Sequence, residues 1–299
     1  MEIARIALHV SAPPGVRIVE ENAELAPFLS TEPGLAQHQD WPVELRLDRP
    51  PDTSTLALLF EAEGWRAYRD GTDVVLEFRL DGSCPGVAAD ESSILWTARL
   101  PPESGRPVVV HPGRPLVHRR DGVTIVQNPL SYPLDQLVMM HLLPIHRGLL
   151  VHAAGIRRPG GAIVFPGRSG AGKSTLMRLL SDRGDVKRLS DDRMVIRLTE
   201  GGAMAFGTPW AGNERVAAND GDELRALAFL RQSPEHRLVR LDPREALHRL
   251  LPMTSILWHD AERSTAALEA CATLVERVPA YDLYFRRDAG VHAVLSDLA

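Results

Sequence analysis

The stretch Gly161-Ala-Ile-Val-Phe-Pro-Gly-Arg-Ser-Gly-Ala-Gly-Lys-Ser-Thr175 decides the fold of this chain. It contains the pattern G-x4-G-K-[S/T], with apolar residues before it and a helix-forming stretch after it. The pattern predicts a strand, a phosphate-binding loop and a helix, so the chain is expected to bind ATP or another nucleoside triphosphate. The expected nucleotide-binding residues are Gly167, Arg168, Ser169, Gly170, Ala171, Gly172, Lys173, Ser174 and Thr175.

Each residue type in this loop has a chemical reason. Glycines let successive backbone N–H groups converge on a phosphate, and the following helix directs its positive end to the same place. We expect Lys173 to reach the β- and γ-phosphates and the Ser174 hydroxyl to bind Mg²⁺. Lys173 and Lys187 are the only lysines among 34 basic residues, and a compact ammonium suits a site that needs a point charge.

Composition places the chain among soluble globular proteins. With 299 residues, 44% of them hydrophobic and 24% charged, it can form one large domain or two ordinary ones. Charges interrupt the first ten residues and the most apolar later stretch, so we predict a cytoplasmic protein with no membrane span. Cys84 and Cys271 lie far apart and outside any ligand pattern, which predicts free thiols rather than a disulfide or a zinc site.

The charge distribution argues against nucleic acid as a partner. The net charge is −5, of which the first 150 residues carry −7 and the rest +2. No basic run is interleaved with aromatic residues, as nucleic-acid binding would favour.

Residues 1–130 are predicted to form a β-rich accessory domain. Short β-type segments separated by Pro, Gly and Asp clusters cover residues 43–47, 55–60, 65–68, 74–80, 94–100, 108–111, 116–118 and 123–127. Two tight turns, at 69–72 and 119–122, predict hairpins. Such a domain could hold an acceptor, form the interface of a homo-oligomer, or cover the second domain.

Residues 131–299 are predicted to form the second domain, which carries the nucleotide loop. Strands are expected at 149–156, 162–166, 186–190, 194–198 and 204–206, and helices at 134–143 and 174–181. A further helix should begin after Asp242, with Pro243 at its first position and Glu245 three residues after the cap, and should run to about residue 251.

Two consecutive carboxylates, Asp191 and Asp192, follow the strand at 186–190. Eighteen residues separate Lys173 from Asp191, enough for one helix and one strand. We therefore expect the 186–190 strand to neighbour the loop strand and to bring both acids to the same sheet edge. There one acid could bind Mg²⁺ and the other could take a proton from an attacking hydroxyl. The alternative is a solvated strand end or a helix cap.

Three segments in this order resemble the catalytic domain of HPr kinase/phosphorylase. They are Leu-Val-His-Ala-Ala-Gly at 150–155, Gly-Arg-Ser-Gly-Ala-Gly-Lys-Ser-Thr at 167–175 and Leu-Ser-Asp-Asp at 189–192. That family is a P-loop kinase branch related in structure to phosphoenolpyruvate carboxykinase. The resemblance, over residues 148–210, implies an α/β P-loop kinase domain, which would follow the β-rich accessory domain predicted from the segment pattern.

The resemblance also implies roles for individual residues. It makes Asp191 the catalytic base, gives Asp192 a place on Mg²⁺ and the phosphates beside Ser174, and lets His152 orient or tune the aspartate. Catalytic residues are thus Asp191, His152 and Lys173, and metal ligands Ser174 and Asp192. Without the resemblance, a lone histidine in an apolar strand such as His152 is more often a core residue than a catalytic one.

The sequence departs from the family after the two acids. Residues 206–214 do not resemble the family's glycine-rich acceptor segment, and the first half differs from its usual N-terminal domain. The chain is more similar to HPr kinase-related kinases that act on other substrates, including lasso peptides. Residues 207–214 could form an acceptor or nucleotide loop that brings Glu214 or Arg215 to the site, or a turn anchored by Trp210.

The predicted activity is Mg²⁺- and ATP-dependent transfer of the γ-phosphoryl group to a hydroxyl. The acceptor would be Ser or Thr of a peptide or protein, or a small hydroxylated molecule. A P-loop NTPase switch or assembly factor is the alternative, in which Asp191 would position water, and a nucleotide-binding scaffold without chemistry is a third.

Overall fold

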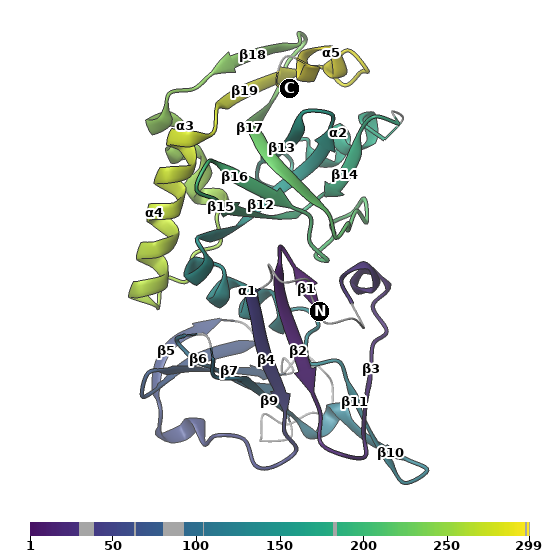
Figure 1. Cartoon of the computed structure of the whole chain (residues 1–299), viewed down its shortest axis with the longest axis vertical. Helices are drawn as coiled ribbons and strands as arrows, with labels where there is room; N and C mark the ends of the chain where they lie inside the picture. The colour runs from purple at the N-terminus through teal and green to yellow at the C-terminus, as the bar shows by residue number, and fades with distance from the viewer. Residues whose placement is uncertain are drawn as a thin grey trace. The chain divides into compact units, whose positions relative to one another are not determined.

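The computed structural model describes residues 1–29, 39–62, 64–79, 93–103, 105–181, 184–296 and 298. The chain divides into two compact units (Figure 1). The first comprises Met1, Arg5–Asn22 and Glu32–Val138, and the second comprises Glu2–Ala4, Ala23–Thr31 and Met139–Ala299. The division falls after Val138, within helix α1 (Leu134–Leu142), and not at the predicted 130–131 boundary. Two N-terminal segments also group with the second unit, which local sequence does not signal.

The first unit is built mainly from β-strands. Its larger sheet has the order β2-β4-β9-β8-β7-β6-β5, and a smaller one has the order β10-β11-β3. The strands are β2 (Ile6–Ser11), β3 (Val16–Val19), β4 (Gln39–Leu45), β5 (Ala57–Ala62), β6 (Trp65–Asp70), β7 (Asp73–Arg79), β8 (Ile94–Leu100), β9 (Val108–Pro112), β10 (Val117–Arg120) and β11 (Val123–Gln127), with 3₁₀ turns η2 (Thr53–Thr55) and η4 (Arg114–Leu116). Both predicted hairpins are confirmed, since β6 pairs with β7 and β10 with β11 in antiparallel register.

The second unit is mixed α/β and contains a closed ring of strands. Following hydrogen-bonded neighbours, β13, β12, β15, β16 and β17 lead back to β13. The strands are β12 (Gly148–Arg158), β13 (Gly161–Pro166), β14 (Lys187–Ser190), β15 (Arg193–Leu198), β16 (Ala203–Phe206), β17 (Gly221–Gln232), β18 (Arg237–Arg240) and β19 (Ala280–Phe285), with β1 (Glu2–Ile3). The helices are α2 (Lys173–Leu179), α3 (Pro243–Leu250), α4 (Ala261–Arg277) and α5 (Val291–Ser296), with turns η1 (Ala23–Phe28), η5 (Pro144–His146) and η6 (Leu251–Met253).

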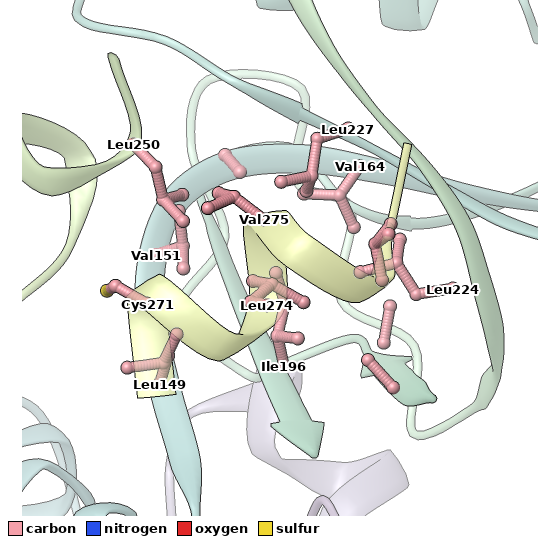
Figure 2. Close-up of a cluster of buried hydrophobic side chains, with 14 of the residues drawn as sticks. Leu149, Val151, Val164, Ile196, Leu224, Leu227, Leu250, Cys271, Leu274 and Val275 are labelled. Atoms are coloured by element: carbon pink, nitrogen blue, oxygen red, sulfur yellow. The ribbon is translucent and has the colours of Figure 1, made fainter. Parts of the chain in front are cut away.

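Alternate residues of the central strands enter two separate cores. On β13, Val164 packs into a core with α3 and α4, whereas Phe165 packs into a core with α2 and α5. Figure 2 shows the first core, where Leu274 and Val275 of α4 lie against strand residues such as Ile196. Helices therefore cover both faces of β13, and its near-continuous apolar sequence follows from burial on both sides.

The neighbour predicted for the strand before the two acids is wrong. β14 pairs with β12 and not with β13, because β12 lies between them and pairs antiparallel with both. β14 and β13 consequently run in the same direction, so the two acids still follow a strand end at the edge where the glycine-rich loop (residues 167–172) begins. The length of the chain between β13 and β14 predicted that the two strands would be neighbours. It gave no indication that β12, which comes earlier in the sequence, would lie between them.

The predicted helix at Asp242 is confirmed. The Asp242 carboxylate accepts a hydrogen bond from the Glu245 backbone N–H, Pro243 occupies the first turn, and α3 ends at Leu250. Of the two cysteines, Cys271 is a buried free thiol in α4 whose pKa is raised by burial to about 11, and Cys84 lies outside the described residues. Within the described part of the chain, no helix is long and apolar enough to cross a membrane.

Acid should destabilise the fold through His146 in η5. Burial lowers the pKa of this imidazole to about 4, with a further contribution from Arg197. An unfolded histidine titrates near 6.5, so folding disfavours the proton, and stability falls as pH drops from about 6.5 to 4 and levels off below. The shift corresponds to roughly 2–4 kcal/mol.

Replacing the imidazole tests this pH dependence. We expect His146→Gln to reduce the loss of unfolding free energy between pH 7 and pH 4.5, measured by urea unfolding at both values. The matched control is His248→Gln, because His248 is an exposed histidine on α3, and this variant should retain the dependence. An unchanged loss in His146→Gln would assign the acid sensitivity to other groups.

Candidate functional site

The glycine-rich loop leaves β13 at Pro166 and enters α2 at Lys173. Gly167 donates its N–H to the His152 carbonyl at 3.1 Å, which fixes the start of the loop against β12. Gly172, the residue before the helix, has φ +107°, and a Cβ there would lie 3.2 Å from Cζ of Phe285. Both observations favour glycine at this position. Because α2 has seven residues, anion binding would depend on the loop N–H groups and Lys173 more than on the helix.

Lys173 lies at the centre of the site and is only 7% exposed. Its Nζ donates to the carbonyl oxygens of Gly167, at 2.7 Å, and Arg168, at 3.3 Å, and lies 2.9 Å from Nε2 of His152. Burial lowers the pKa of this ammonium, and the neighbouring Asp192 opposes that effect. Two carbonyl groups of the glycine-rich loop therefore hold the Lys173 ammonium against the start of the loop.

His152 lies between a cation and an anion. The Nε2 atom that is near Lys173 is also 3.0 Å from Oδ1 of Asp192. The hydrogen bond from His152 and the charge of Arg193 lower the pKa of the Asp192 carboxyl, against the opposing effect of burial. Asp192 keeps 34% of its side chain exposed. The family resemblance implied that His152 would orient the catalytic aspartate, Asp191, whereas the structure places its Nε2 against Asp192.

Asp191 has a different environment from its neighbour. It is 3% exposed, and its carboxylate accepts three backbone hydrogen bonds. The N–H groups of Gly212 and Val216 donate to Oδ1 at 2.9 and 3.2 Å, and that of Glu214 donates to Oδ2 at 2.8 Å. A Cβ on Gly212 would lie 2.9 Å from Oδ2 of Asp191. Both oxygens are therefore used to hold the chain at residues 212–216.

Residues 207–214 combine features of both alternatives left open by the sequence. Trp210 is buried at 7% exposure, as the anchored turn requires. Gly212 nevertheless lines the cavity at the site, and the Glu214 side chain accepts from Nε of Arg178 on α2 at 3.1 Å. Arg215 lies 3.9 Å from Glu24, a residue of η1. This segment is thus a fixed wall between α2 and the two acids.

A cavity of about 390 Å³ brings most of these groups together. It lies where the glycine-rich loop, His152 in the middle of β12, the two acids after β14 and the start of the 212–216 segment meet. Its lining residues are His152, Ser169, Gly170, Gly172, Lys173, Ser174, Thr175, Asp191, Asp192, Gly212, Asn213, Gln232 and Arg287. Of the residues predicted from sequence, Gly167, Arg168 and Ala171 are not in this lining, although the first two hold Lys173 through their carbonyls.

The residues predicted to bind Mg²⁺ fit a site in which the ion binds together with a nucleotide. The Ser174 hydroxyl and the Asp192 carboxylate line the same cavity and are hard oxygen ligands. The described residues contain no group of three His, Cys, Asp or Glu side chains placed to hold a metal by themselves. Mg²⁺ bound with a nucleotide takes its other ligands from phosphate and water, so two protein oxygens are sufficient.

Sequence reasoning missed Gln232 and Arg287 in the cavity wall, and it did not single out Asn213 within the 207–214 segment. Gln232 ends β17 and Arg287 follows β19, and both strands run parallel to β13 in the same sheet. The available signal was an apolar run followed by polar residues, at 224–232 and again at 280–287. Without the pairing of β13, β17 and β19, that signal does not connect either residue to the glycine-rich loop.

No family model matches the chain, and no curated protein matches it either.

Proposed function

We propose that this protein is a Mg²⁺- and ATP-dependent kinase that transfers the γ-phosphoryl group to a hydroxyl of a peptide, protein or small molecule. The observation that carries the proposal is the convergence of Lys173, His152 and Asp192 in one cavity against a glycine-rich loop. A phosphate-binding cation, an ionised carboxylate and a group that orients the carboxylate are the side chains that phosphoryl transfer to an alcohol needs. An ATP-dependent kinase of this kind would work in the cytoplasm.

In this proposal the roles of the two acids differ from those implied by the family resemblance. Asp192 takes the acceptor's proton, because it is the carboxylate with an exposed side chain in the cavity. Asp191 is a positioning residue, because its oxygens already accept three amide hydrogen bonds. The acceptor oxygen forms a bond to the γ-phosphorus, the bond from that phosphorus to the β,γ-bridging oxygen breaks, and the hydroxyl proton goes to Asp192.

The shared position of His152 Nε2 gives the site two hydrogen-bonding arrangements. One nitrogen cannot accept a hydrogen bond from Lys173 and donate one to Asp192 at the same time. In the first arrangement the imidazole proton is on Nδ1 and Nε2 accepts from Lys173. When Lys173 turns to a phosphate oxygen, the imidazole can change tautomer, with the Nδ1 proton lost to solvent and one taken up at Nε2, and Nε2–H then donates to Oδ1 of Asp192. Nucleotide binding would then orient the base through His152, which favours a kinase over a bare nucleotide scaffold.

Charge on the transferred group would be stabilised by Lys173 and by the N–H groups of the glycine-rich loop. The Ser174 hydroxyl would hold Mg²⁺, which neutralises charge on the β- and γ-phosphates. The partner of this reaction is a hydroxyl-bearing acceptor, and neither nucleic acid nor a membrane has a part in it. The first unit remains available to bind the acceptor or to form a homo-oligomer.

Transfer of label from γ-labelled ATP tests the proposal. The protein, with Mg²⁺, is incubated with an extract of its source cells separated into peptides, proteins and small molecules. We expect label to move to an acceptor in one fraction with the wild type and not with Asp192→Asn. Release of phosphate to water, with no labelled acceptor in any fraction, would instead identify an NTPase switch or assembly factor.

A further inference from the structure

A second cavity of about 450 Å³ adjoins the one that contains Lys173. The two cavities share Gly172, Thr175, Gln232 and Arg287 as lining residues. The second cavity therefore continues the first past Gly172, at the junction of the glycine-rich loop and α2. It lies away from His152, Asp191 and Asp192, which line only the first.

The topology explains why this cavity lies beside the loop. Strand β17 pairs in parallel with both β13 and β19, so the carboxyl ends of the three strands meet at one edge. The glycine-rich loop follows β13, Ser233 and Pro234 follow β17, and Arg286 and Arg287 follow β19. Clefts outside the carboxyl ends of adjacent strands are where α/β proteins place extended ligands.

The walls of this cavity differ chemically from those of the first. The exposed Pro234 and the small accessible part of Phe285, which is 2% exposed, give it an apolar surface. Gln232 and Ser233 add groups that can both donate and accept hydrogen bonds. Arg287 lies at the junction and forms no ion pair within the described part of the chain. An apolar surface with a few polar groups suits a nucleobase and ribose, and an unpaired cation at the junction suits the phosphates next to the ribose.

These walls are held together before any ligand binds. Ser233 donates its N–H to the Phe285 carbonyl at 3.1 Å, which ties the segment after β17 to the end of β19. The Asp288 carboxylate accepts from the Gly290 N–H at 2.9 Å and lies 2.8 Å from Nε2 of His236. The contacts of Ser233 and His236 join the same two segments, so little ordering would be required on binding.

We infer that this second cavity binds the nucleoside end of the triphosphate, with Arg287 contacting the phosphates nearest the ribose. The inference rests on the proposed function, since it requires the first cavity to hold the phosphates. It assigns recognition of the nucleoside to Gln232, Ser233 and Pro234. The glycine-rich loop would bind the phosphates and would not distinguish one nucleoside from another.

The first test compares ATP with inorganic tripolyphosphate in calorimetric titrations of the wild-type protein with Mg²⁺. Because the walls would bury part of the base and ribose, ATP should bind at least about 10-fold more tightly than tripolyphosphate. Equal affinities would overturn the inference while leaving the proposed kinase intact. Binding of neither ligand would instead count against the proposed function.

The second test is protection of an introduced cysteine. Pro234 and Glu235 are adjacent and exposed, but only Pro234 lines the cavity. In Pro234→Cys, saturating ATP should slow alkylation at residue 234 at least about fivefold, and tripolyphosphate should not; in the control Glu235→Cys, neither should. Peptide mass spectrometry separates these sites from Cys271, whose buried thiol has its pKa raised. Alkylation of residue 234 at an unchanged rate with ATP bound would overturn the inference.

Discussion

Lys173→Met is expected to reduce phosphoryl transfer by about 100- to 1000-fold, because it removes the cation that stabilises charge on the transferred group. It should also weaken ATP binding by about 10- to 100-fold, the value of one hydrogen bond to a charged group. Methionine keeps most of the side-chain volume in a position that is only 7% exposed. The measurements are initial rates with γ-labelled ATP and calorimetric titration with Mg²⁺–ATP.

Lys187 supplies a matched control, because it is the only other lysine in the chain. Its Nζ pairs with Oδ2 of Asp220 at 2.6 Å, and it does not line the cavity. Lys187→Met should leave both transfer and ATP affinity within about twofold of wild type, since exposed ion pairs contribute little. Wild-type transfer by Lys173→Met, with the fold intact, would show that phosphate is held without this ammonium.

Local sequence patterns predicted the individual elements around the site well. The bounds of β8 and β11 match those predicted, and α3 begins at its predicted cap. In each case short-range physics decides the outcome: β-branched runs between turns form strands, and a capping carboxylate starts a helix. The sequence also predicted that Lys173 and the two acids lie at one edge of the sheet, because only a short stretch of chain separates them.

Pairing between distant segments could not be predicted in the same way. Nothing in residues 148–158 indicates that β12 separates β13 from β14, or that β13 pairs with β17. The parallel pairing of β2 with β4, and of β4 with β9, also depends on the whole sheet. Gln232 and Arg287 reach the site only through such pairings, so no spacing rule near the glycine-rich loop could have identified them.

The two acids illustrate a further limit of sequence reasoning. Asp191 and Asp192 are chemically identical neighbours, and a strand end turns successive side chains in different directions. Both carboxylates line the cavity, and residues 212–216 decide which of them has its oxygens occupied, because their N–H groups bind Asp191. That segment lies about twenty residues farther along the chain, so the sequence motif could not separate the two roles.

Paired substitutions of the acids should give opposite results. Asp192→Asn is expected to lower transfer by about 100- to 10,000-fold, the usual contribution of a general base, with little change in unfolding free energy. Asp191→Asn should instead destabilise the protein by about 2–4 kcal/mol, because the amide NH₂ cannot accept a hydrogen bond that the carboxylate accepts. Transfer rates at saturating ATP and urea unfolding curves measure the two effects.

Magnesium dependence separates the proposed role of Asp192 from the metal role that the sequence predicted for it. If Asp192 takes the acceptor's proton, the loss in Asp192→Asn persists at any Mg²⁺ concentration, because saturating the metal does not restore a base. If Asp192 chiefly binds Mg²⁺ beside Ser174, raising Mg²⁺ should recover much of the rate. A stable but inactive Asp191→Asn, with Asp192→Asn still active, would return the base to Asp191. The three roles can be separated because the loss of each changes a different measurement. Loss of a base lowers the rate at saturating metal, loss of a metal ligand lowers metal affinity, and loss of a carboxylate that holds a loop lowers stability.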